Sequence, residues 1–91
     1  LLSNPLNAET ILTKLEILNK SHACLKDSKN QVCKKLILQL ERVQLDEFEQ
    51  NRFKCQSSIL GLQTELVEAH FFGSDLIFHN GIMIPYVIKN C

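Results

Sequence analysis

The chain lacks the features that mark several large classes of protein. Its 91 residues carry ten basic and ten acidic side chains, so no net charge attracts a nucleic acid or an anionic membrane. No apolar run approaches the ~18–20 residues that span a bilayer. The hydrophobic residues make up 45% and the charged residues 22%, as in an ordinary globular chain. We therefore predict a folded domain without a transmembrane segment and without nucleic-acid binding.

Signatures of catalysis and of metal binding are also missing. The chain has no G-x-S-x-G elbow, no phosphate-binding loop and no recognised local signature around a cysteine. Its potential metal ligands include no C-x-x-C pair of the kind that structural zinc sites use. These potential ligands are His22, Cys24, Cys33, Cys55, His70, His79 and Cys91. We predict no enzyme, no cofactor and no metal, and we interpret His22 as a partly buried core histidine or a pH-sensitive residue in a helix seam.

The four cysteines indicate a cross-linked scaffold. An even count in a short chain favours two disulfides in an oxidising compartment over four free thiols. We predict a bond between Cys24 and Cys33 across a turn between two helices, which leaves Cys55 and Cys91 to tether the C-terminal segment. A glycosylation acceptor triplet that begins at Asn19 agrees with this compartment. These features favour a secreted or surface location, the alternative being a cytoplasmic protein with free cysteines.

Apolar spacing predicts a first helix over about residues 7–25. Asn7 can cap its start, and a stripe at four- and three-residue intervals follows. The stripe consists of Ile11, Leu15, Leu18, His22 and Leu25. A polar turn follows, in which Asp27 or Ser28 can cap the next helix.

A long helical tract is predicted over about residues 29–70, which contains no proline and one glycine, Gly61. One stripe comprises Val32, Leu36, Leu40 and Val43, and a second comprises Leu45, Phe48, Cys55, Ile59, Leu62, Leu66 and Ala69. The second is rotated by roughly 100° from the first, so a straight helix cannot bury both against one neighbour. We expect a bend, or burial against different partners. The weakest helical stretch lies at 56–58 and Gly61, with the acidic cluster at 46–49 as an alternative hinge.

A β-hairpin is predicted over about residues 75–89. Asn80 and Gly81 lie between two apolar runs, which is the strongest short hairpin signal. Pro85 would place its strand at an edge. The predicted fold is therefore mostly α, as one domain or an excised fragment spanning residues 1–91. It comprises a helical hairpin with a long, possibly broken second helix and a C-terminal β-hairpin.

This architecture predicts a non-enzymatic helical interaction or oligomerisation module of a secreted or surface protein. A long helix followed by a reversing apolar hairpin resembles, in architecture alone, the helical core regions of some viral envelope glycoproteins. A cytosolic coiled-coil adaptor or assembly subunit, and a secreted helical carrier of a lipid or small apolar ligand, are the alternatives. The chain begins with Leu1 rather than Met, so we expect a processed chain or a piece of a longer one. The predicted interface residues are Leu45, Phe48, Arg52, Ile59, Leu62, Leu66, Phe71 and Phe72.

Overall fold

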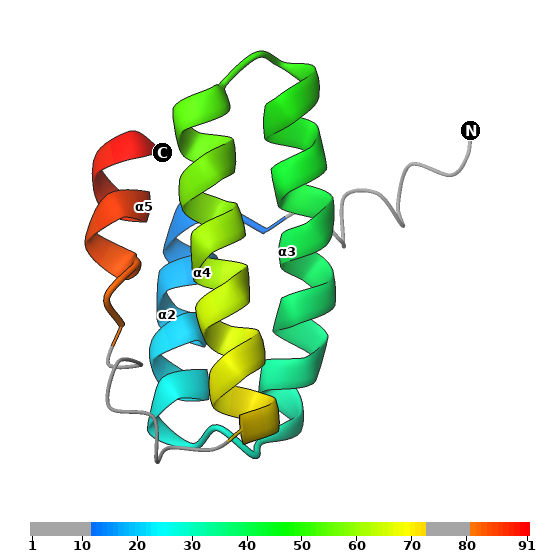
Figure 1. Cartoon of the computed structure of the whole chain (residues 1–91), viewed down its shortest axis with the longest axis vertical. Coiled ribbons are helices and arrows are strands. Elements are labelled where there is room, and N and C mark those ends of the chain that lie inside the picture. The colour runs from blue at the N-terminus through cyan, green and yellow to red at the C-terminus, as the bar shows by residue number, and fades with distance from the viewer. Residues whose placement is uncertain (1–11, 73–80) are drawn as a thin grey trace.

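The described part of the chain is a bundle of helices. A computed structural model describes residues 12–72 and 81–91. The helices are α2 (Lys14–Lys26), α3 (Gln31–Glu49), α4 (Phe53–Phe72) and α5 (Ile84–Asn90). Figure 1 shows α3 and α4 antiparallel and side by side, α2 behind them, and α5 on the side of α4 away from α3. The radius of gyration is 13.0 Å, close to the ~12 Å expected for a compact domain of this length.

The long helical tract is two helices, and the break lies between the two positions considered from the sequence. The backbone turns at residues 50–52, where Asn51 adopts a left-handed conformation with φ 63°. Asparagine tolerates this region better than most residues other than glycine. The expected weak stretch at Ser57 and Gly61 is regular helix within α4. The turn therefore depends on one asparagine, without the proline or glycine that usually marks a break.

This turn explains why the two apolar stripes point in different directions. Once α4 folds back along α3, the part of the second stripe that lies on α4 faces the first stripe and joins it in one core, whereas Leu45 and Phe48 lie on α3 and are exposed. Leu36, Leu40, Ile59, Leu62 and Leu66 are all 1% exposed or less. The rotation between the stripes therefore encodes a helical hairpin within one chain. Of the two expected alternatives, a bend and burial against different partners, the structure shows the bend.

The first described helix starts later than the sequence spacing predicts and buries a different face. Thr13 caps α2, with reciprocal hydrogen bonds between the Thr13 hydroxyl and the Glu16 backbone and between the Glu16 carboxylate and the Thr13 backbone. The bond from the Thr13 backbone lowers the pKa of Glu16. The buried residues are Ile17, Ser21 and Cys24. Asn7 and Ile11 lie outside the described residues.

The predicted stripe on this helix is therefore displaced from the face that packs. Leu18 and Leu25 are half-buried at its border, whereas Leu15 and His22 are exposed. The interpretation of His22 as a core or seam residue was wrong. Ser21 and Cys24 occupy the buried face because a small side chain and a disulfide sulfur allow α2 to lie close to its neighbours. The predicted stripe contains neither Ser21 nor Cys24.

The β-hairpin prediction was wrong, because residues 84–90 form α5 and no strand occurs among the described residues. Ile84 and Val87, three residues apart, are buried as on a helix face. Pro85 lies in the first turn, where its fixed φ and missing N–H suit a helix start. A seven-residue apolar run fits a strand or a helix, and here the helix allows Ile84 and Val87 to reach the core. The first predicted strand, with Asn80 and His79, lies outside the described residues.

The part of the turn prediction that concerns Gly81 is confirmed, because its φ is positive, at +80°. Replacing Gly81 by valine should lower the free energy of unfolding by about 2 kcal/mol, because a β-branched residue is strained at positive φ. An added Cβ would also lie 3.1 Å from Ile84 Cδ1. Urea unfolding followed by circular dichroism measures the change. Ile82, exposed in the same turn, is the control for the valine side chain itself. If Gly81→Val and Ile82→Val have equal midpoints, the backbone conformation at Gly81 does not constrain the fold.

Candidate interaction surfaces

The predicted interface residues divide into two groups in the structure. Ile59, Leu62 and Leu66 lie in the chain's own core and are not available to a partner. The others lie at the surface: Leu45, Phe48 and Arg52 near the α3–α4 turn, and Phe71 and Phe72 at the end of α4. The structure does not bring the exposed residues into one surface, because α4 separates the turn from its own C-terminal end.

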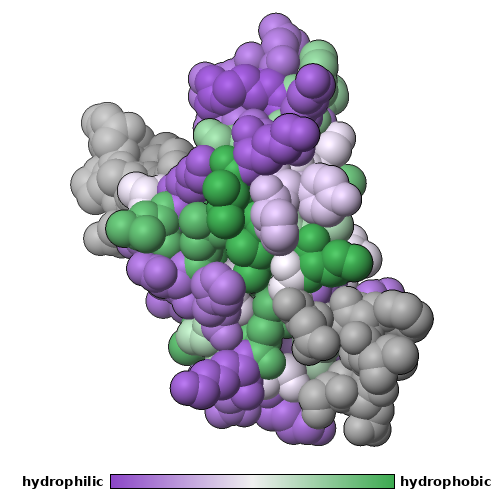
Figure 2. All heavy atoms as spheres, turned by 90° about the vertical axis from the view of Figure 1, so that its left-hand side faces the viewer, coloured by the Kyte–Doolittle hydropathy of each residue, from purple (hydrophilic) through white to green (hydrophobic). Residues whose placement is uncertain are grey.

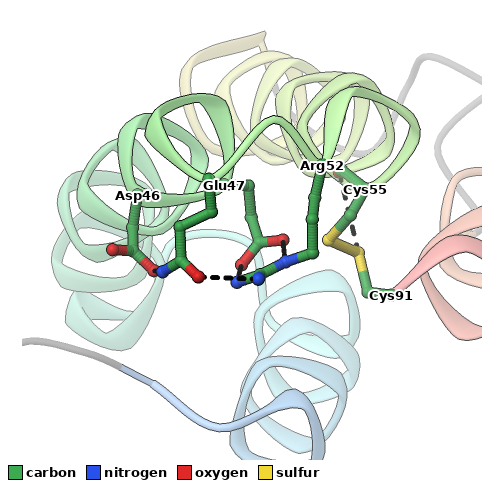
Figure 3. A network of polar contacts seen from close by, with 6 residues as sticks. Asp46, Glu47, Arg52, Cys55 and Cys91 are labelled. Atoms are coloured by element: carbon green, nitrogen blue, oxygen red, sulfur yellow. Dashed lines mark hydrogen bonds and ion pairs between the residues drawn. A yellow bond between two sulfur atoms is a disulfide. The ribbon is translucent and has the colours of Figure 1, made fainter.

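A polar network closes the α3–α4 turn. Arg52 donates through Nε and Nη2 to the two oxygens of Glu47, at 2.6 and 2.8 Å, and through Nη1 to the Gln50 amide oxygen. The Gln50 amide nitrogen in turn donates to Asp46. Figure 3 shows these groups in a row beside the disulfide between Cys55 and Cys91. Arg52, one of the predicted interface residues, is thus paired with Glu47 of its own chain.

The hydrogen bond from Arg52 lowers the pKa of Glu47 and raises the pKa of the guanidinium. Because the pKa of Glu47 is lower in the folded chain than its ordinary 4.5, the pair stabilises the fold above that value. The stabilisation is lost as the pH falls toward the lowered value. Glu47→Gln should therefore make the loss of stability between about pH 5 and pH 3 shallower than in the wild type. Urea titrations at several pH values test this. Glu49→Gln, at an exposed carboxylate at the end of α3 with no ion-pair partner among the described residues, is the control.

A buried carboxylate holds the start of α5. Glu65 on α4 is 3% exposed and accepts three backbone hydrogen bonds, from Gly81 at 2.8 Å, Ile82 at 3.0 Å and Met83 at 3.1 Å. These N–H groups precede or begin a helix and have no intrahelical acceptor. No side chain of α5 caps its own start. Glu65 therefore acts as a cap supplied by another helix.

Glu65 is not among the candidate residues that the sequence indicated. The one signal was negative: residues 81–83 contain no serine, threonine, aspartate or asparagine to cap the following helix. Nothing local connects that missing cap with a carboxylate sixteen residues earlier. Its role depends on a tertiary contact.

The other end of α5 is held by a covalent bond and a hydrogen bond. Cys91 is bonded to Cys55 at the start of α4, and the Asn90 amide donates to the Ser58 hydroxyl at 2.8 Å. The second disulfide joins Cys24 of α2 with Cys33 of α3. Both predicted cysteine pairs thus form, although the tethered segment is a helix rather than a strand. The short α5 is therefore fixed at both ends on α4.

An open pocket of about 600 Å³ lies between the first half of α4 and α5. Its apolar lining comes from Phe53, Met83 and Tyr86, and its charged lining from Lys54 and Lys89. The remaining lining residues are Ser57, Ser58 and Asn90. Among residues 12–72 and 81–91, no acidic side chain lines the pocket. Neither lysine forms an ion pair within residues 12–72 and 81–91. The described lining of the pocket therefore combines apolar side chains with positive charge.

Every aromatic residue in the described part of the chain is more than half exposed. These residues are Phe48, Phe53, Phe71, Phe72 and Tyr86. Aliphatic residues are exposed as well, including Leu15 on α2, Ile82 just before α5 and Ile88 on α5. Figure 2 looks onto the side of the molecule that carries α5 and shows hydrophobic side chains across the middle of this face. Aromatic side chains usually dominate a core, so their collective exposure is unusual.

The two described histidines lie on different helices. His22 is exposed on α2, and the ring of His70 on α4 is 2.6 Å from the Ser28 carbonyl oxygen. Within the described ranges, no three histidine, cysteine, aspartate or glutamate residues form a group that could hold a metal ion. Asn19, the predicted glycosylation residue, is exposed on α2.

Neither the described helices nor comparison with known proteins identifies a family for this chain. Of the helices that the structure describes, none is both long and apolar enough to cross a membrane. Comparison of the chain with protein-family models, with curated proteins and with solved structures finds no match.

Proposed function

We propose that the protein is a non-enzymatic interaction module of a secreted or surface protein, which binds a protein partner through exposed aromatic side chains. The exposure of Phe48, Phe53, Phe71, Phe72 and Tyr86 carries this proposal. Aromatic residues are enriched among those that contribute most to protein–protein binding. Because the core is formed by aliphatic residues and disulfides, the fold does not require these rings inside.

Two further observations support an extracellular setting. Both disulfides are characteristic of chains that fold in an oxidising compartment. Asn19 is exposed, so a glycan attached there would extend into solvent. A cytosolic adaptor, the alternative, would carry these four cysteines reduced. The resemblance to viral glycoprotein cores lacks support in the described residues, because the tract is not one long helix and residues 84–90 form no strand.

Site-specific photo-crosslinking tests the proposal. A benzophenone amino acid is introduced in turn at Phe48, Phe71 and Tyr86, with exposed Lys34 on α3 as the control position. The oxidised protein is irradiated alone and in extracellular fluid of its source organism. We expect adducts at one or more aromatic positions that are at least about tenfold more abundant than at Lys34 and that unlabelled protein competes away. Equal, non-competable labelling at all four positions would contradict the proposed function.

A further inference from the structure

Phe48 and Phe53 form an apolar contact between two oppositely charged surfaces. Their rings meet edge to face across the α3–α4 turn, with centroids 5.8 Å apart. Phe48 lies in the last turn of α3, beside an acidic sequence, whereas Phe53 lines the positively charged pocket between α4 and α5. Both rings are about half exposed. We call these two rings together with the charged groups on either side the dipolar patch.

The acidic side of the dipolar patch is the end of α3. Leu45, Phe48 and Glu49 are three and four residues apart and share one exposed face. Asp46 is hydrogen-bonded to Gln50, and Glu47 is neutralised by Arg52. Glu49 has no ion-pair partner among the described residues. An exposed phenylalanine is thus followed immediately by a carboxylate that is free to meet a cation.

The basic side is the pocket itself. Lys54 follows Phe53 directly on α4, and Lys89 lies across the pocket on α5. Phe53, Met83 and Tyr86 supply an apolar surface between them that suits an aromatic or aliphatic side chain. The occupant with the best chemical fit is therefore an apolar side chain adjacent to a carboxylate, which describes Phe48 with Glu49.

We propose that a second copy of this chain occupies the pocket, in a two-fold symmetric dimer. A patch with an apolar centre, acid on one side and base on the other is complementary to itself after a rotation of 180° about that centre. Phe48 and Glu49 of each copy then meet the pocket and the lysines of the other, and both contacts form at once. The net charge of zero adds no repulsion between copies. This inference rests on the proposed function, since it names one partner for that interaction module.

Charge reversal tests the dimer, with sedimentation equilibrium and native mass spectrometry of the full oxidised chain as readouts. Glu49→Lys places lysine opposite lysine, and the double variant Lys54→Glu, Lys89→Glu places glutamate opposite glutamate. Each of these two variants, by itself, should raise the dissociation constant of the dimer at least about tenfold, because like charges across an interface are costly. All three positions are exposed, so the circular dichroism spectrum of each variant should match that of the wild type and exclude misfolding. Lys34→Glu, at an exposed residue outside the patch, is the control and should dimerise as the wild type does.

The two variants complement each other when mixed. In a two-fold dimer of one Glu49→Lys chain with one doubly reversed chain, lysine faces glutamate at both contacts. We expect the mixture to form heterodimers with an affinity restored to near that of the wild type. A wild type that stays monomeric up to millimolar concentration, or a mixture no tighter than its components, would overturn this inference. The proposed function survives that result if photo-crosslinking still shows a competable partner of another kind, and it fails separately if no such partner appears.

Discussion

Replacing Cys55 and Cys91 together by alanine is expected to lower the free energy of unfolding by about 4 kcal/mol. The bond joins residues 36 apart, and closing a loop of that size removes this much chain entropy from the unfolded state. The matched control is the double alanine variant of Cys24 and Cys33. The bond that it removes joins residues 9 apart, so the loss should lower the free energy of unfolding by about 2.5 kcal/mol. Urea unfolding of both variants, with circular dichroism as the signal, gives the two values.

The longer disulfide should also have a local effect that the shorter one lacks. Loss of the Cys55–Cys91 bond frees the C-terminal end of α5, so amide hydrogen exchange should accelerate over residues 84–90 before it does in α3 or the rest of α4. The Cys24 and Cys33 variant should leave exchange in α5 nearly as in the wild type. A Cys55 and Cys91 variant with unchanged stability and unchanged α5 protection would show that α5 does not depend on this bond.

Replacing Glu65 by glutamine should lower the free energy of unfolding by about 2–3 kcal/mol. The glutamine side chain keeps one acceptor oxygen, but its NH₂ group replaces the other carboxylate oxygen. That NH₂ group would face a backbone N–H that donates a hydrogen bond to the carboxylate in the wild type. The buried charge-assisted bonds to Gly81, Ile82 and Met83 cannot all survive. Denaturant unfolding measures the loss, and amide exchange over residues 81–87 shows where it acts.

Glu49→Gln is the control for this substitution, because Glu49 is exposed and has no ion-pair partner among the described residues. It should change stability by less than about 0.5 kcal/mol. If Glu65→Gln were as mild as Glu49→Gln, the carboxylate would not be what holds the start of α5.

The apolar periodicity predicted the core residues well. It did not predict whether the same chain or a partner chain would cover them. The two stripes of the tract at 29–70 contain Leu36, Leu40, Ile59, Leu62 and Leu66, all of them core residues. Their offset by about 100° has two physical solutions, a partner chain or a turn. The turn at Asn51 was hard to detect, because a single left-handed asparagine carries no proline or glycine signal. The sequence left open a bend or burial against different partners, and the structure shows the bend.

The C-terminal segment shows where local signals become ambiguous. Its apolar run satisfied the pattern of a strand, and the glycine that indicated a turn does adopt positive φ. The contacts that favour a helix come from residues distant in sequence. Glu65 accepts hydrogen bonds from the backbone N–H groups at the start of α5, and Cys55 is bonded to Cys91, which directly follows its last residue. The pocket with Lys54 and Lys89 exists only because α5 lies on α4. Sequence reasoning could predict neither the pocket nor the dipolar patch.

We propose that this chain is an extracellular module, and its helices are held together by two specific disulfides. Peptide mapping under non-reducing conditions, on protein secreted by eukaryotic cells, tests it most directly. The account predicts one peptide pair that joins Cys24 with Cys33, one that joins Cys55 with Cys91, and no thiol that reacts with an alkylating reagent. Recovery of Cys55 and Cys91 as free thiols, or bonded to other partners, would contradict the account.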